Sequence, residues 1–143
     1  MPVFKRYMRS PRLKAKHVMS TPPVTIEVGR SIAEAARLMA ERGVGSLIVV
    51  DKQGLVKGIL TERDIINSLA SGKACAEGKV EDIMSRNPIV ASPDDDLEII
   101  IEKMRDMNIR HIPVIDEDGR PLGMISVRDI IDLGVSALKL FVE

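Results

Sequence analysis

The chain has 143 residues, no net charge, no tryptophan, two phenylalanines, one tyrosine and one cysteine. This length predicts one domain-sized unit with a core of aliphatic residues and methionine. The scarcity of aromatic side chains excludes a stacking platform for single-stranded nucleic acid. The single Cys75 excludes an intramolecular disulfide framework. No apolar run is long enough for a membrane span and no apolar signal core is present, so we expect a cytoplasmic protein.

The neutral total hides an uneven distribution of charge. Residues 1 to 79 contain 14 Lys and Arg against 7 Asp and Glu, whereas residues 80 to 143 contain 7 against 14. The two parts therefore carry charges of +7 and −7. Opposite charges of this size favour contact between unlike halves, which predicts a head-to-tail arrangement if the protein forms a homodimer.

Residues 1 to 16 form a basic arm. They contain no acid and six basic residues, namely Lys5, Arg6, Arg9, Arg12, Lys14 and Lys16. Such an arm can bind nucleic acid or anionic ligands. It can equally be a solvated tail or a segment that lies across the acidic half of a partner subunit. Four interspersed apolar residues, Phe4, Tyr7, Met8 and Leu13, indicate that part of the arm packs.

After the arm the chain repeats itself. Residues 18 to 66 align without a gap with residues 83 to 131, and 12 of these 49 pairs are identical. Most other pairs are conservative, such as Val24 with Ile89. Internal duplication is the simplest explanation.

The sequence of each copy predicts an amphipathic helix between two extended segments. The first begins at Ser31, where Glu34 completes a capping box, and the second begins after Asp94 to Asp96, whose acids offset the helix dipole. A divalent-metal cluster is the less favoured reading of these three acids. The helices end at Gly43 and Asn108, because both residue types accept a left-handed backbone.

Three short strands accompany this helix in each copy. Proline favours an extended start at residues 23–26 and 88–90. Two apolar strands then flank a turn in each copy: residues 47–50 and 56–60 around 51–54, and residues 112–115 and 122–125 around 116–119. A second helix follows, and the last one is expected to reach about Lys139.

The copies therefore predict an α/β (α+β) chain of two β-α-β-β-α repeats. We expect a basic arm at residues 1–16, repeats at 17–70 and 80–135, a linker at 71–79, and the end of the last helix at 136–143. A three-stranded sheet with two helices on one face leaves its other face uncovered. The repeats should therefore pack sheet to sheet about a pseudo-two-fold axis.

A short motif closes each copy at the start of its second helix. Gly58 to Asp64 reads GILTERD and Gly123 to Asp129 reads GMISVRD, so a hydroxyl residue is followed three positions later by an aspartate. This spacing places a hydroxyl, a carboxylate and free backbone N–H groups together at the positive end of a helix. A phosphate and a sugar diol could both bind there, although helix capping alone also explains the motif.

The motifs together resemble a tandem pair of cystathionine β-synthase (CBS) domains, the Bateman module, in a small stand-alone protein. The resemblance covers residue 17 to about residue 135. It implies two clefts between the repeats that bind adenine nucleotides or adenosyl compounds: AMP, ADP, ATP, NAD or S-adenosylmethionine. It also implies that the aspartate takes the ribose hydroxyls, the Thr or Ser takes ribose or phosphate, and the base lies among residues of the other repeat.

The resemblance implies two sets of ligand-binding residues. Site A comprises Ser126, Arg128 and Asp129, with Arg110 and His111 for phosphate, closed by Met19, Pro22, Pro23, Val24, Val44 and Gly45. Site B comprises Thr61, Arg63 and Asp64, closed by Met84, Asn87, Pro88, Ile89, Ile109 and Arg110. The first copy has only Gly45 and Ser46 where the second has Arg110 and His111. We therefore expect site A to bind nucleotide phosphates more tightly. His111 could instead be an ordinary strand histidine.

The preferred function is a non-catalytic regulatory module that senses an adenosyl ligand and transmits its occupancy to a partner protein. No nucleophile, base and orienting group have catalytic spacing, and His17 has no metal-spaced partner, so neither catalysis, a required cofactor nor a metal site is expected. A homodimer that meets through its helices is expected from the resemblance. The alternatives are a nucleic-acid-binding regulator that uses the basic arm, and a purely structural dimer.

Overall fold

A computed structural model describes residues 12–72 and 77–141. Its elements are α2 (Ala15–Val18), β1 (Thr25–Glu27), α3 (Ile32–Arg42), β2 (Ser46–Val50), β3 (Val56–Thr61), α4 (Glu62–Ala70), the 3-10 helix η1 (Val80–Asp82), β4 (Ser85–Arg86), α5 (Leu97–Met107), β5 (His111–Ile115), β6 (Pro121–Ser126) and α6 (Val127–Lys139). Cys75 and residues 1–11 of the basic arm lie outside the described residues.

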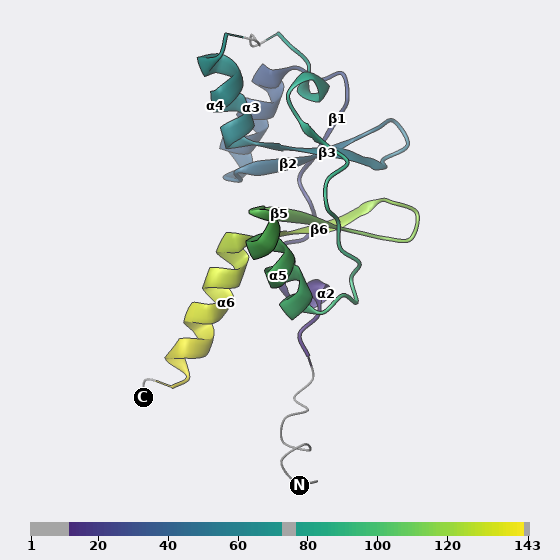
Figure 1. Cartoon of the computed structure of the whole chain (residues 1–143). Coiled ribbons are helices and arrows are strands. Elements are labelled where there is room, and N and C mark those ends of the chain that lie inside the picture. Colours follow the sequence, from purple (N-terminus) through teal and green to yellow (C-terminus); the bar gives the residue numbers. More distant parts are fainter. Residues whose placement is uncertain (1–11, 73–76, 142–143) are drawn as a thin grey trace, which may run out of the picture.

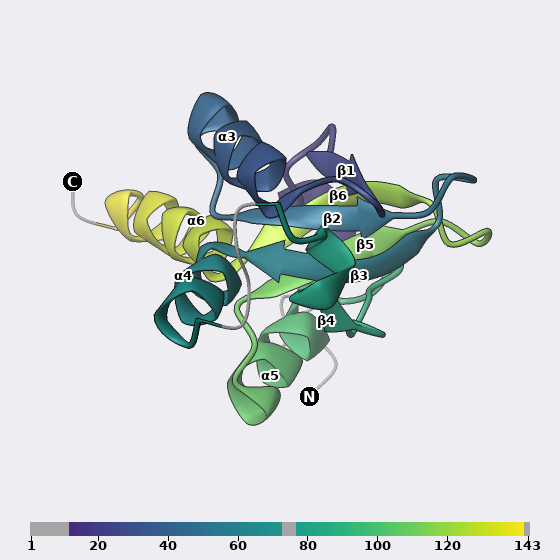
Figure 2. The same cartoon turned by 90° about the horizontal axis from the view of Figure 1, so that it is seen from above.

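The two repeats stack with their sheets face to face and their helices outward, as expected (Figure 1). Figure 2, viewed from above, shows β2 and β3 lying over β5 and β6. The strand β2 is buried along its whole length. It needs apolar residues on both faces, because one face meets the helices of its own repeat and the other meets the second sheet. No helix in the described residues is long and apolar enough to cross a membrane.

The sheets differ from the prediction of three strands in each copy. The first sheet has the order β1-β2-β3-β4, and β4 comes from the start of the second copy. The second sheet has only β5 and β6, extended by single bridges from Ala91 to Val114 and from Ser20 to Met124. The segment that leads into each copy, which we call its leading segment, therefore pairs with the last strand of the other copy. The sequence could not show this exchange, because strand pairing between copies leaves no periodic pattern.

The same exchange appears in the two hydrophobic cores. Val80, the first residue of the predicted second repeat, is fully buried in the core of the first repeat with six other residues: Ile26, Ala35, Met39, Leu47, Val49 and Leu60. Ala15, which precedes the first copy, is fully buried in the core of the second repeat with Ala91, Ile100, Met104, Ile112, Val114 and Ile125. The leading segments are thus part of the folded cores. Residues 15 and 16 belong to the second repeat in space, although we expected the first repeat to begin after a separate arm.

The helix ends agree in part with the sequence. Gly43 and Asn108 have φ angles of 63° and 52°, so both adopt the predicted left-handed conformation. The Ser31 side chain accepts a hydrogen bond from the Glu34 N–H, as a helix cap does. The predicted capping box is only half formed, because the Glu34 carboxylate lies 3.7 Å from the Arg30 guanidinium and makes no reciprocal bond.

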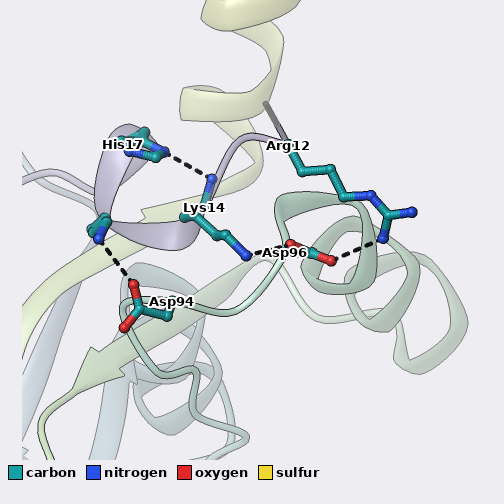
Figure 3. Close-up of polar contacts among 6 residues, drawn as sticks. Arg12, Lys14, His17, Asp94 and Asp96 are labelled. Carbon is teal, nitrogen blue, oxygen red and sulfur yellow. Dashed lines mark hydrogen bonds and ion pairs between the residues drawn. The ribbon is translucent and has the colours of Figure 1, made fainter. Parts of the chain in front are cut away.

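The acids before α5 lie at the helix start as predicted, and two of them also form ion pairs that were not predicted. Asp96 occupies the N-cap position but its side chain caps nothing, since its two oxygens pair with Lys14 Nζ at 2.9 Å and Arg12 Nη1 at 3.2 Å. Asp94 pairs with Lys16 Nζ at 2.9 Å (Figure 3). Lys14 and Arg12 hold the pKa of the Asp96 carboxyl below its usual range, and Lys16 does the same for Asp94.

Backbone contacts fix this end of the arm in place. Ala15 N–H donates to the Asp95 carbonyl at 2.9 Å, Lys16 N–H to the Pro93 carbonyl at 3.0 Å, and Leu97 N–H to the Leu13 carbonyl at 2.9 Å. The described part of the arm therefore lies across the acidic half of its own chain. Part of the charge separation that favoured a head-to-tail dimer is compensated within one molecule.

Candidate functional site

The two closing motifs form the same hydrogen-bonded cap. Asp129 Oδ2 accepts from the Ser126 N–H at 2.8 Å and from Ser126 Oγ at 2.9 Å, while the Asp129 N–H donates to Ser126 Oγ at 3.1 Å. In the first repeat, the Thr61 N–H donates to Asp64 Oδ2 at 2.9 Å and the Asp64 N–H donates to Thr61 Oγ1 at 3.2 Å. Both motifs therefore stabilise helix starts, which is the structural role considered for them.

Asp129 has a further partner in the first repeat. Its Oδ1 accepts a hydrogen bond of 3.3 Å from Ser20 Oγ. Ser20 also pairs with Met124 through two backbone bonds, of 2.9 and 3.1 Å, at the edge of β6. The cap of α6 thus touches the segment that leads into the first repeat.

A cavity of about 580 Å³ opens beside this contact. Its volume lies in the range of small-molecule sites. Ten of the eleven predicted site A residues line its wall: Pro22, Pro23, Val24, Val44, Gly45, Arg110, His111, Ser126, Arg128 and Asp129. The first five come from the first repeat and the other five from the second, so the wall is shared by both repeats.

Met19 is the predicted site A residue that is not part of this wall. It packs beneath β6, and a Cβ at Gly123 would meet Met19 Sδ at 2.7 Å and the Ser20 carbonyl at 2.8 Å. A Cβ at Gly58 would likewise lie 2.6 Å from Met84 Sδ and 2.6 Å from the Ser85 carbonyl oxygen. These glycines permit a close approach that holds the leading segment of one repeat on the last strand of the other.

Seven further residues line the cavity: Ser20, Gly43, Ser46, Glu62, Met124, Val127 and Ile131. Glu62 was the least foreseeable, because it belongs to the motif of site B. The Glu62 N–H donates to the Gly45 carbonyl at 3.0 Å, and its carboxyl carbon lies 3.3 Å from the position of a Cβ on Gly45. Of these residues, Ser20 and Ile131 had a signal in the sequence, because each is identical in both copies.

His111 lies between opposite charges. Burial lowers the pKa of its imidazole, Arg110 lowers it further, and the carboxylates of Asp129, Glu62 and Asp64 act in the opposite direction. The net effect is a pKa below the usual value of a histidine. The ring is therefore neutral at neutral pH and can donate or accept a hydrogen bond in the cavity.

Three charged side chains of the wall have no ion-pair partner among the described residues. Arg110, Arg128 and Glu62 form no ion pair with any residue in the described ranges, and all three are exposed. The cavity thus offers two guanidinium groups, one free carboxylate and the partly occupied carboxylate of Asp129.

The residues of site B come from both repeats. Thr61 and Asp64 cap α4, and Arg63 is exposed on its first turn. Met84 packs against the first core, whereas Ile89 and Ile109 pack against the second. Asn87 adopts a left-handed φ of 49° directly before Pro88, and Arg110 faces the site A cavity. The pairing of β4 with β3 places Ser85 and Arg86 beside the strand that ends at Thr61. Ligand binding by this set stays a prediction.

Comparison with known proteins gives consistent results. The CBS domain matches residues 15–71 and 80–136. L-aspartate semialdehyde sulfurtransferase of Methanocaldococcus jannaschii is 36% identical over 123 residues, which are 86% of this chain and 23% of that enzyme. This chain thus spans about a quarter of that relative.

Two solved structures resemble the fold. The CBS domain pair of protein MJ0100, in complex with 5′-methylthioadenosine and S-adenosyl-L-methionine, has a TM-score of 0.83 and 33% identity over 89% of this chain and 99% of that chain. The CBS domain protein PAE2072 of Pyrobaculum aerophilum, complexed with AMP, has a TM-score of 0.77 and 26% identity over 86% of this chain and 99% of that chain. With two matched domains, exchanged leading segments and a cavity shared by both repeats, the chain belongs to the CBS domain family as a tandem pair.

Proposed function

We propose that this protein is a regulatory module that binds an adenosyl compound in the cavity beside Asp129. The observation that carries the proposal is the composition of the wall. The capped start of α6, with Asp129 and Arg128, faces an apolar segment, Pro22 to Val24, contributed by the other repeat. One ligand with a polar sugar and an apolar base would contact both repeats.

The chemistry of the wall fits such a ligand. A carboxylate accepts two hydrogen bonds from the vicinal hydroxyls of a ribose, and Asp129 holds one oxygen that only the Ser20 hydroxyl contacts among the described residues. The start of α6 and the free Arg110 favour an anionic substituent. Proline and valine side chains can cover a purine without aromatic residues. The complexes of MJ0100 and PAE2072 with adenosyl compounds support this assignment.

We propose a regulatory rather than a catalytic role. The sulfurtransferase relative matches this chain over 23% of its own length, so its activity is not transferred here. A ligand that bridges the two repeats can change the angle between them, and this change is what a partner would sense. In this proposal, no cofactor takes part in a reaction.

The surface proposed for transmission is the exposed apolar face of α4 and α6. Ile66 and Leu69 on α4, and Ile131, Val135 and Leu138 on α6, are all exposed. Ile66 and Ile131 are equivalent positions of the duplication, so the two helices present matching faces to a second copy of the chain. Ile131 also lines the cavity. We therefore propose a homodimer in which ligand occupancy acts on the interface through α6.

The proposal is tested by thermal unfolding with AMP, ATP, NAD and S-adenosylmethionine. A ligand at one hundred times its dissociation constant should raise the free energy of unfolding by about 2.7 kcal/mol. No shift with any of the four compounds would favour a structural dimer. A nucleic-acid role receives no support from Lys14 and Lys16, whose charges are already paired with Asp96 and Asp94.

A further inference from the structure

The charges of the site A cavity are of both signs, and its second acid, Glu62, was not among the predicted site A residues. Two arginines, Arg110 and Arg128, line it together with two acids, Glu62 and Asp129. Counting His111 as neutral, the formal charges of these four side chains cancel. The basic groups Arg110 and His111, from which we expected tighter binding of nucleotide phosphates at site A, thus lie in the same wall as an acid from the other repeat.

Glu62 reaches this cavity through the geometry of α4. It is the first residue of that helix, directly after the capping Thr61, and its backbone N–H is held by the Gly45 carbonyl at 3.0 Å. Its carboxylate oxygens lie 3.4 and 3.5 Å from the position of a Cβ on Gly45, which is itself part of the wall. A Cβ on residue 45 would therefore lie in tight contact with this carboxylate. The equivalent residue of the second repeat is Val127, so this charge has no counterpart at site B.

The opposite charges in the wall do not neutralise one another directly. Across the described ranges of the chain, Glu62 forms no ion pair with Arg110 or Arg128. A polyphosphate would satisfy the arginines but would be repelled by Glu62. A ligand without charge would use neither sign. A ligand that carries a carboxylate and a cationic centre on the same adenosyl group would use both.

We infer that site A prefers an adenosyl compound that carries a sulfonium as well as a carboxylate, with the carboxylate on the arginines and the sulfonium near Glu62. This inference rests on the proposed function and makes Glu62 its specificity-determining residue. S-adenosylmethionine has the required charges. S-adenosylhomocysteine is the matched probe, because it lacks the sulfonium charge and one methyl group but keeps the adenosyl and amino-acid parts.

The test is a calorimetric titration of the full chain with S-adenosylmethionine, S-adenosylhomocysteine and ATP. The wild type should bind S-adenosylmethionine most tightly. In Glu62→Gln, the preference for S-adenosylmethionine over S-adenosylhomocysteine should fall by roughly fivefold, and ATP should bind several-fold more tightly, since one charge is removed at nearly constant shape. Glu41→Gln is the control, because Glu41 is exposed on α3 and is not part of the wall.

The outcomes separate the two levels of the proposal. If the wild type binds these compounds but Glu62→Gln leaves all three affinities in the same ratio, the role of Glu62 is overturned and the adenosyl-binding function stands. Tighter binding of ATP than of S-adenosylmethionine by the wild type would also overturn the preference. If the wild type binds no adenosyl compound, the proposed function fails, and the inference fails with it.

Discussion

The hydroxyl of Ser20 donates a 3.3 Å hydrogen bond to Asp129 Oδ1, which joins the leading segment of the first repeat to the last helix of the second. The other oxygen of this carboxylate is held by the cap of α6. A ribose diol that binds Asp129 therefore has to share or replace the contact with Ser20. In the proposed function, ligand binding would therefore be coupled to the position of the leading segment at this atom.

Removing this competing contact should strengthen ligand binding. In Ser20→Ala, Asp129 Oδ1 is free for the ribose, and a hydrogen bond of about 0.5–1.5 kcal/mol no longer has to be displaced. We expect adenosyl ligands to bind roughly twofold to tenfold more tightly in a calorimetric titration. Ser85→Ala, at the equivalent position of the second repeat, is the control and should leave this affinity unchanged. Weaker binding by Ser20→Ala would mean that the hydroxyl contacts the ligand itself.

The close approach at Gly123 predicts a loss of stability on substitution. A Cβ there would lie 2.7 Å from Met19 Sδ and 2.8 Å from the Ser20 carbonyl, so the leading segment has to move away from β6. Gly123→Ala should lower the free energy of unfolding by about 1–3 kcal/mol in urea denaturation. Gly134→Ala is the matched control on α6, where a Cβ meets no atom within 4 Å. It should raise the stability by about 0.5–1 kcal/mol through helix propensity. Equal effects of both substitutions would contradict the packing described for Gly123.

The ion pairs of Asp96 predict a salt-dependent stability. Because Lys14 and Arg12 lower the pKa of Asp96 in the folded state, its charged form stabilises the fold above the unfolded pKa of about 3.9. This contribution is lost as the pH falls through the lower pKa of the folded state. Asp96→Asn should therefore have a lower melting temperature than the wild type at pH 7 and low salt. The difference should shrink at high salt and in strong acid.

Glu102→Gln provides the control for this comparison. Glu102 is an exposed acid of α5 beyond its first turn and forms no ion pair within the described residues. The melting temperature of this control variant should stay close to that of the wild type at every salt concentration. A salt-independent loss in Asp96→Asn would assign the effect to something other than these ion pairs.

His111 predicts a second pH dependence, closer to neutrality. Its pKa is lowered in the fold by burial, so the unfolded chain takes up the proton first as the pH falls below about 6.5. The stability of the wild type should therefore decrease between pH 7.5 and pH 5, because the unfolded state binds more protons in this range. His111→Gln cannot take up this proton and should show a flatter profile in urea denaturation across the same range. Parallel profiles for both proteins would contradict the lowered pKa.

The elements of the fold could be read from the sequence because each has a local signal. Gly43 and Asn108 marked the ends of two helices, and the turns at residues 51–54 and 116–119 marked the hairpins. The exchange of leading segments had no such signal. Val80 and Ala15 are single small apolar residues in polar surroundings, and only the folded cores show where they are buried.

The repeated motif made the centre of the site predictable, and the rest of the wall was predicted less completely. Ser126 and Asp129 were found because Thr61 and Asp64 repeat their spacing. Glu62 was missed because its neighbours in sequence, Thr61 and Arg63, belong to predicted site B. Its own side chain lines the site A cavity instead. The ion pairs of Asp94 and Asp96 were not predicted, because the basic residues that bind them lie about eighty positions earlier in the chain.

The most direct test of the adenosyl site compares Asp129→Ala with Asp64→Ala. Both substitutions remove the same kind of helix cap, at a cost of about 0.5–2 kcal/mol of stability, so they are matched controls for folding. The measurement is a calorimetric titration of both variants and the wild type with S-adenosylmethionine and AMP. Our account predicts that Asp129→Ala loses tight binding by at least about tenfold while Asp64→Ala retains it. Loss of tight binding in Asp64→Ala, with unchanged affinity in Asp129→Ala, would contradict the assignment of the ligand to the cavity beside Asp129.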